Sequence, residues 1–164
     1  MDAYIEVLGD KSYVARYETA EQIAKHPSKK AVEPLLKLLA DESIEVRDRA
    51  MSSLSHFKFP EMKTRLKELA KDKNPTVAGT ASAWLLRYDE RDVDLSLVNA
   101  LLDAELYPRR FYGGDNVRGL VKLLEKYGDA SSLPVLRKAA ESKHAHVAEP
   151  AKIAIEALEK RITK

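Results

Sequence analysis

The segment with the strongest potential for binding chemistry is a short run of two basic and two aromatic residues. A proline precedes the run and two glycines follow it, and the run itself is Arg109, Arg110, Phe111 and Tyr112. Arginine and aromatic side chains are enriched at interface hot spots, and guanidinium groups bind carboxylates and phosphates. The run therefore predicts a recognition loop. The alternative is that Phe111 and Tyr112 pin the loop onto the rest of the fold.

Metal and catalytic chemistry find little support. The chain has four histidines and no cysteine. His144 and His146 are two residues apart, a spacing that points side chains in different directions on a helix. No set of His, Asp and Glu has the spacing of metal ligands, and no phosphate-binding loop or nucleophile elbow is present. The sequence favours a non-catalytic protein without a metal or cofactor.

The elements that would position a binding site are helices with a repeated apolar stripe. A triad of apolar residues spaced four positions apart occurs three times in the chain. The second copy follows the first by 31 residues, and the third lies near the C-terminus: Val46, Ala50 and Leu54; Val77, Ala81 and Leu85; Val147, Ala151 and Ile155. This spacing follows one face of an α-helix. Helical units repeated at a fixed period predict a solenoid, because no unit can bury its apolar face alone.

The fold class that follows is all-α. We predict an α-solenoid of about five helical hairpins in one domain over residues 1–164, with units at about 1–29, 30–59, 60–89, 90–127 and 128–164. Ala50, Ala81 and Ala151 should lie where neighbouring helices approach closely. The fourth unit carries about nine extra residues within 106–114, and such insertions form loops, often on the binding side of a solenoid.

The outward face of each second helix is another candidate surface. If the apolar stripe faces the core, the residues five, six and nine positions after each valine face outward. In the second, third and fourth units these are Met51, Ser52 and Ser55; Ser82, Ala83 and Leu86; Lys122, Leu123 and Lys126. Small uncharged side chains let a partner helix approach, and exposed apolar patches usually contact something. The alternative is that curvature or the inserted loop covers this face.

The overall charge is nearly balanced. The 28 basic and 26 acidic residues give a net charge of +2, which argues against nucleic acid or anionic membrane as the main target. No apolar stretch approaches the ~18 residues that a membrane span needs. The N-terminus carries acidic residues where a signal peptide has positive charge. We expect a cytoplasmic protein without membrane association.

Two passages carry a resemblance to a known family. Residues 31–47, and more briefly residues 127–136, are similar to a repeat of the HEAT superfamily, specifically the short HEAT-like repeats of the phycobilin-lyase type. The resemblance implies an α-solenoid whose second helices line the concave side. It also implies a polar ladder between repeats, built from an aspartate in the turn and an arginine after the valine. Asp41 and Arg47 match that pair.

The enzymes with this type of repeat fit the chain poorly. Deoxyhypusine hydroxylases need His-Glu dipeptides for their irons, and no histidine here is followed by Glu. HEAT-like alkylpurine DNA glycosylases would use a basic channel with an aromatic residue and a carboxylate. Trp84, the only tryptophan, instead continues the apolar stripe and is expected in the core. The repeat type alone also implies a role as a bilin lyase-type subunit, although no residue of the chain indicates bilin binding.

The sequence therefore favours a protein-interaction scaffold or adaptor. It would bind an acidic or helical protein or peptide partner through the second-helix face and the inserted loop. The first alternative is a nucleic-acid-associated protein that contacts phosphates through Arg109, Arg110, Arg118 and Lys122; the second is a bilin lyase-type subunit. The salt dependence of binding distinguishes the scaffold from the nucleic-acid-associated protein, because phosphate binding weakens steeply as the salt concentration increases.

Overall fold

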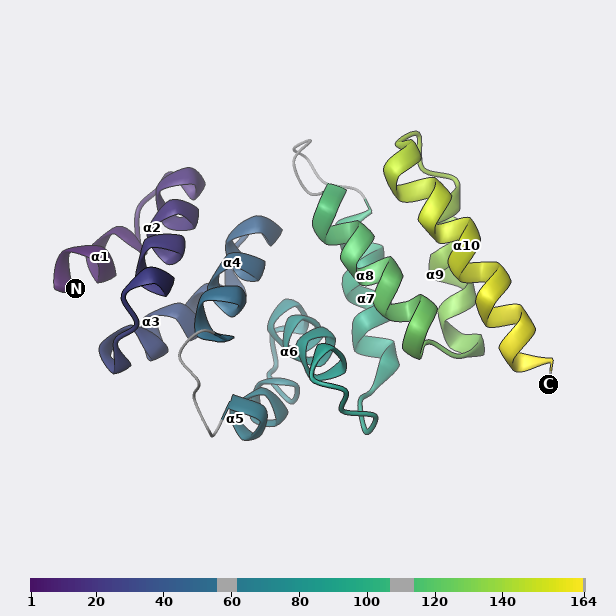
Figure 1. Cartoon of the computed structure of the whole chain (residues 1–164), viewed down its shortest axis with the longest axis horizontal. Coiled ribbons are helices and arrows are strands. Elements are labelled where there is room, and N and C mark those ends of the chain that lie inside the picture. The colour runs from purple at the N-terminus through teal and green to yellow at the C-terminus, as the bar shows by residue number, and fades with distance from the viewer. Residues whose placement is uncertain (56–61, 107–113, 164) are drawn as a thin grey trace. The chain divides into compact units, whose positions relative to one another are not determined.

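The computed structural model describes residues 1–55, 62–106 and 114–163 (Figure 1). Ten α-helices and three short 3-10 helices make up the secondary structure of these residues, which contain no β-strand. The predicted all-α fold of helical hairpins is confirmed. The helices group into two compact units, Met1–Arg65 and Leu66–Lys164, and the division falls within helix α5 (Met62–Leu69).

The first unit contains two hairpins. Its helices are α1 (Asp2–Val7), α2 (Tyr13–Lys25), α3 (Val32–Lys37) and α4 (Ile44–Ser55), with 3-10 turns at Lys29–Ala31 and Leu38–Ala40. The two second helices, α2 and α4, pack against each other. The fully buried side chains of this core include Ile23, Leu35, Leu39, Val46 and Leu54.

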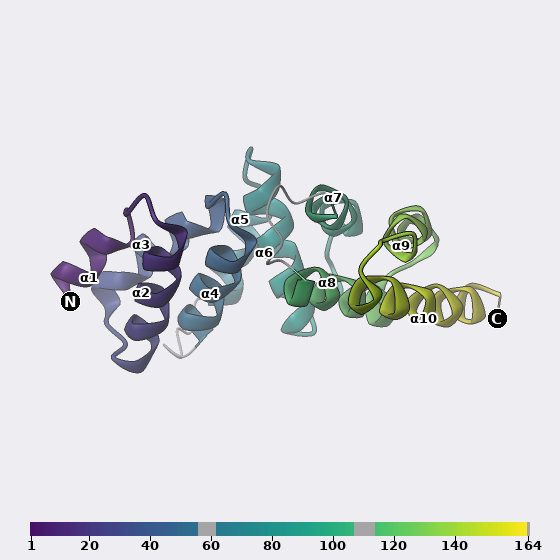
Figure 2. The same ribbon diagram turned by 90° about the horizontal axis from the view of Figure 1, so that it is seen from above.

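The second unit begins with the end of α5 and contains five further helices. They are α6 (Pro75–Arg87), α7 (Leu95–Glu105), α8 (Gly114–Tyr127), α9 (Leu133–Ala140) and α10 (Ala145–Ile162), with a 3-10 turn at Ala130–Ser132. Helix α10 packs on α8 and α9, and α6 packs on α7. Figure 2 shows α7 and α9 in one layer and α8 and α10 in the other. No helix among the described residues combines the length and the apolar character that a membrane span requires.

The repeated stripe lies in the core, as predicted. Ala50, Ala81 and Ala151 have no exposed surface, so helices do approach closely at these positions. The valines and leucines of the stripe are also buried. Ile155 is the exception, since its side chain on α10 is only half-buried.

Asp41 is the centre of a polar junction between the first two hairpins. Its carboxylate accepts hydrogen bonds from Nε and Nη2 of Arg16, at 2.7 and 2.8 Å. Arg47 instead donates to the backbone carbonyl of Asp41, at 2.7 Å. The family resemblance assigns Asp41 and Arg47 to a polar ladder between repeats, but their side chains do not bind each other. The carboxylate is bound by the arginine of the preceding hairpin.

The two arginines occupy equivalent places in successive repeats. Arg16 precedes Arg47 by 31 residues, and its Nη1 donates to the carbonyl oxygens of Asp10 and Lys11 at 2.8 and 3.1 Å. Nη1 of Arg47 binds the corresponding carbonyls one period later. Each arginine therefore ties the start of its own helix to the preceding turn, and Arg16 also binds across the hairpins.

A similar arginine contact joins α10 to α8. Arg161 donates to the carbonyl oxygens of Glu125, Lys126 and Gly128, at 3.0, 3.3 and 2.6 Å. The last carbonyls of a helix have no partner within the helix, and a cation there also complements the helix dipole. Arg161 thus caps the C-terminal end of α8 from a neighbouring helix.

We predict that Asp41→Ala lowers the free energy of unfolding by about 3 kcal/mol, because it leaves the buried Arg16 guanidinium without its carboxylate. The side chains of Arg16 and Asp41 are 9% and 6% exposed. Urea denaturation measures the loss. Asp72→Ala is the control, since the exposed Asp72 holds the equivalent place in the next repeat and accepts from the Asn74 backbone N–H. It should lose about 1 kcal/mol or less. Equal losses would contradict the central role of the Arg16–Asp41 pair.

Gly79 lies at a close approach between α6 and α7. A Cβ atom at this position would lie 2.9 Å from the carbonyl oxygen of Leu97 and 2.9 Å from Cβ of Leu101. At Gly119 on α8, the atom nearest to an added Cβ is Nη2 of Arg87, at 3.2 Å. The first neighbour is rigid backbone, whereas the second is the end of a flexible side chain.

The two glycines should therefore respond in opposite directions to alanine. Gly79→Ala should destabilise the protein by about 1–2 kcal/mol, because overpacking at the helix crossing exceeds the gain in helix propensity. Gly119→Ala should stabilise it by about 0.5–1 kcal/mol, because the arginine can move aside. Thermal and urea denaturation followed by circular dichroism measure both effects. Stabilisation by Gly79→Ala would show that α6 and α7 do not cross here.

Candidate interaction surface

The structure corrects the outward face predicted for the second and third units. Met51, Ser82, Ala83 and Leu86 are 0%, 0%, 3% and 2% exposed, so these side chains do not form an open surface. The reason is clearest on α6, where every residue from Val77 to Ala83 is buried. The small side chains of α6 allow other segments of the same chain to pack closely against this helix.

The remaining predicted residues differ in their exposure to solvent. Ser52 is half-buried, and Lys122 on α8 is exposed as predicted, while Leu123 beside it is buried. The side chain of Ser55 lies outside the described residues. So does the whole predicted recognition loop, Arg109, Arg110, Phe111 and Tyr112.

One face of α8 carries a line of exposed cations, which we name the α8 stripe: Arg118, Lys122 and Lys126. Successive members are four residues apart, which places them on one side of the helix with about 6 Å between their backbone positions. The opposite side packs into the core through Val117, Leu120, Val121 and Leu124. Within the described part of the chain, the side chains of Arg118 and Lys122 make no ion pair. The stripe is therefore open to an anionic partner.

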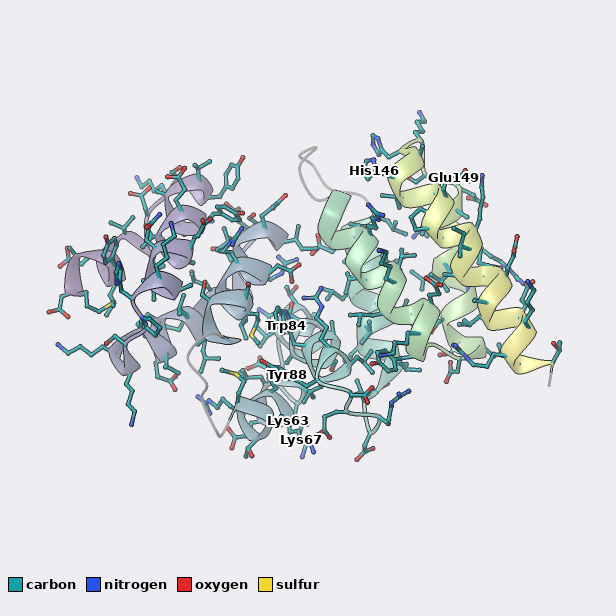
Figure 3. All side chains as sticks on the ribbon, viewed as in Figure 1. Lys63, Lys67, Trp84, Tyr88, His146 and Glu149 are labelled. Atoms are coloured by element: carbon teal, nitrogen blue, oxygen red, sulfur yellow. The ribbon has the colours of Figure 1, made fainter. Side chains whose placement is uncertain are left out.

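An arginine of α6 lies beside this stripe. Nη2 of Arg87 lies close to Gly119 of α8, as the 3.2 Å approach to an added Cβ shows. The Arg87 guanidinium also lies over the Trp84 ring, 4.7 Å from its centroid. Trp84 is half-buried rather than fully in the core, and its ring is 6.3 Å from that of Tyr88 on the same helix (Figure 3). A cation that approaches α8 thus lies over a partly exposed aromatic ring of α6.

Four residues meet where the α8 stripe ends, and we name this group the Asp89 corner. Oδ1 of Asp89 accepts a hydrogen bond from the Tyr127 hydroxyl at 2.8 Å. The same oxygen lies 3.1 Å from Nη2 of Arg91 and 3.9 Å from Nζ of Lys126. Both cations also lie over the Tyr127 ring, at 4.4 and 4.6 Å from its centroid. Lys126 belongs to both the corner and the stripe.

The backbone places the Asp89 carboxylate in this corner. Asp89 follows the C-cap of α6 and has φ of 62°, in the left-handed region that glycine adopts most easily. Its N–H binds the carbonyl of Leu86, and the N–H of Glu90 binds that of Leu85, both at 3.0 Å. This is the hydrogen-bond pattern of a Schellman motif. An aspartate stands where glycine would fit with less strain, and this backbone places its carboxylate beside Tyr127 and the two cations.

The corner also sets the charge of Asp89. The hydrogen bond from Tyr127 lowers the pKa of this carboxyl below its usual range, and the nearby Arg91 lowers it further. Asp89 is therefore ionised at neutral pH. Two cations and one hydroxyl thus surround a single negative charge.

Two histidines lie close together at the start of α10. The rings of His144 and His146 lie 5.6 Å apart, and Figure 3 shows His146 and Glu149 near the start of α10. No group of three or more His, Cys, Asp or Glu side chains that could hold a metal ion occurs in the described ranges.

We predict that Tyr127→Phe raises the pKa of Asp89, because it removes the main hydrogen bond to the carboxylate. A carboxyl whose pKa is lowered by folding stabilises the fold above its unfolded pKa, and the effect disappears as the pH falls through the folded pKa. In Tyr127→Phe this stabilisation should be smaller. An NMR titration of the Asp89 carboxyl carbon measures the shift, with Tyr4→Phe as the control. An unchanged Asp89 titration would show that the hydroxyl does not bind it.

Comparison with known proteins identifies the family of the helical hairpins. A family model for HEAT repeats matches residues 1–87, more than half of the 164-residue chain. The match runs from α1 to the end of α6 and stops before α8 and its stripe. No curated protein matches the chain. The helical hairpins and the matched repeats together show that this chain belongs to the HEAT-repeat family.

Proposed function

We propose that this chain is a non-catalytic protein-interaction scaffold whose α8 stripe binds an acidic segment of a partner protein. The observation that carries the proposal is the line of exposed cations, Arg118, Lys122 and Lys126. HEAT repeats commonly serve as interaction scaffolds, which supports the general class of function. A cytoplasmic location, expected from the composition, is part of the same proposal.

The spacing of the stripe favours a helical partner segment. Acidic side chains at every fourth position of a partner helix repeat at the same interval of about 6 Å as the cations of α8. Each exposed ion pair would contribute ~1 kcal/mol or less, so a single pair does not give useful affinity. A line of matched charges instead increases the association rate and sets the register of the partner.

The residues beside the stripe supply contact area as well as charge. Trp84 is half-buried and the Arg87 guanidinium lies over its ring, 4.7 Å from the centroid. Tryptophan and arginine are the residue types most often found at binding hot spots. An apolar side chain of the partner could pack on the exposed part of this pair while its acidic residues contact α8. We also propose a second contact through Arg109, Arg110, Phe111 and Tyr112 of the inserted loop, on the basis of their residue types.

The other functions have weaker support. The cations of α8 would also attract phosphates, but a net charge of +2 gives little general attraction to nucleic acid. The finer resemblance to phycobilin-lyase repeats, and the bilin-related role that it implies, rests on the sequence alone.

A charge reversal in the stripe tests the proposal. We predict that Lys122→Glu weakens binding of a synthetic helical peptide with glutamate at every fourth position by about tenfold or more, because it places like charges opposite each other. Fluorescence anisotropy measures the affinity. Lys29→Glu is the matched control: this exposed lysine lies in the first unit, so the same change of net charge should have little effect.

Two results would contradict the proposed function. If both reversals weaken peptide binding equally, only the net charge of the chain matters and the stripe is not a site. If a single-stranded oligonucleotide displaces the peptide and binds more tightly, with an affinity that falls steeply with salt, the nucleic-acid function replaces the proposed one.

A further inference from the structure

We propose that Arg91, Lys126 and the Tyr127 hydroxyl form a carboxylate-binding subsite, which Asp89 fills until an acidic side chain of a bound partner displaces it. The inference rests on the proposed function, because it assumes an acidic segment along the α8 stripe. The inference defines a carboxylate site at the end of the α8 stripe. In this site, Asp89 competes with the carboxylate of the partner.

The geometry of the corner is that of a small anion site. Three groups from two parts of the chain converge on one carboxylate oxygen, with the Tyr127 hydroxyl at 2.8 Å, the Arg91 guanidinium at 3.1 Å and the Lys126 ammonium at 3.9 Å. A hydroxyl donor and two cations are a suitable set for binding a carboxylate. Arg91 and Lys126 also lie against the Tyr127 ring, which restricts where their charges can go.

The corner is accessible from solvent. The side chains of Asp89, Arg91 and Lys126 are 66%, 64% and 64% exposed. An incoming carboxylate can therefore reach the cations without any opening of the core. Ion pairs between exposed side chains contribute little to stability, so the fold does not depend on Asp89 keeping its place.

The position of the corner links it to the stripe. Lys126 is the last cation of the α8 stripe and one of the cations that contact Asp89. A partner helix that places acidic residues opposite Arg118 and Lys122 would bring its next acidic residue, four positions on, to Lys126. That third carboxylate would enter the corner and compete with Asp89 for the same donors.

Asp89 has an advantage in this competition because it is tethered. Its backbone is fixed by the Schellman motif at the end of α6, which keeps its carboxylate at a high effective concentration beside the donors. A partner with only two suitably placed carboxylates gains nothing at the corner. A partner with a third must displace Asp89, so the corner lowers the affinity for such longer acidic segments below the value that an empty corner would give.

Asp89→Asn tests the inference. Asparagine keeps the size of the side chain and also tolerates the left-handed backbone, so the turn should be preserved. Because the variant removes the competing charge, we expect it to bind the glutamate peptide about fivefold more tightly, equivalent to roughly 1 kcal/mol. A shorter peptide that lacks the third glutamate should show a smaller gain. Circular dichroism checks that the variant is folded.

Asp92→Asn is the matched control. Asp92 is exposed in the same connection, and the variant loses the same charge without affecting the contacts to Tyr127. Equal gains in both variants would reflect net charge and overturn the subsite, while the loss in Lys122→Glu would still support the scaffold function. In the wild-type protein, the Asp89 carboxyl carbon signal should move toward its position in Tyr127→Phe when the peptide binds. An unmoved signal would also overturn displacement.

Two further results separate this inference from the proposed function. If the peptide binds neither the wild-type protein nor Asp89→Asn, both the scaffold surface and the subsite are wrong. If Asp89→Asn gains affinity for a single-stranded oligonucleotide and none for the peptide, the corner binds phosphate rather than carboxylate, and the carboxylate assignment is overturned.

Discussion

Close approach between helices at residues with little or no side chain is the constraint on which the rest of this structure depends. Ala50, Ala81 and Ala151 are fully buried, and Gly79 admits α7 so closely that a single added carbon would meet its backbone. A hairpin of two short helices cannot bury its apolar stripe alone, so each depends on contact with another. The small residues allow that contact, and the leucines and valines around them supply the buried apolar area.

This packing decides where a binding surface can lie. On α6, packing covers nearly the whole helix, and few side chains reach solvent. On α8, one side packs through Val117, Val121 and Leu124, while the other presents Arg118, Lys122 and Lys126. The cations that packing leaves on the exposed side of α8 therefore lie along one line of this helix. The Asp89 corner lies at the end of that line because α6 ends near the C-terminus of α8.

The parts of this arrangement that could be predicted from sequence are those with a regular period. The i, i+4, i+8 stripe predicts the buried positions of α4, α6 and α10 with the exception of the half-buried Ile155. The outward positions were wrong for Met51, Ser82, Ala83 and Leu86, because counting along one helix assumes that its far side meets water. The Asp89 corner could not be predicted, since residues 89 and 91 meet residues 126 and 127 only in the folded chain, and the insertion before α8 breaks the period.

The contact between Arg161 and the end of α8 has a consequence for any trimmed form of this protein. Arg161 lies in the last turn of α10, yet its guanidinium holds the carbonyls of Glu125, Lys126 and Gly128. A protease that removes this turn would take away a few exposed residues of α10 and leave its buried face nearly complete. It would also release the end of α8 beside Lys126. Such a truncated protein could keep most of its helical content and still lose the alignment of its cations.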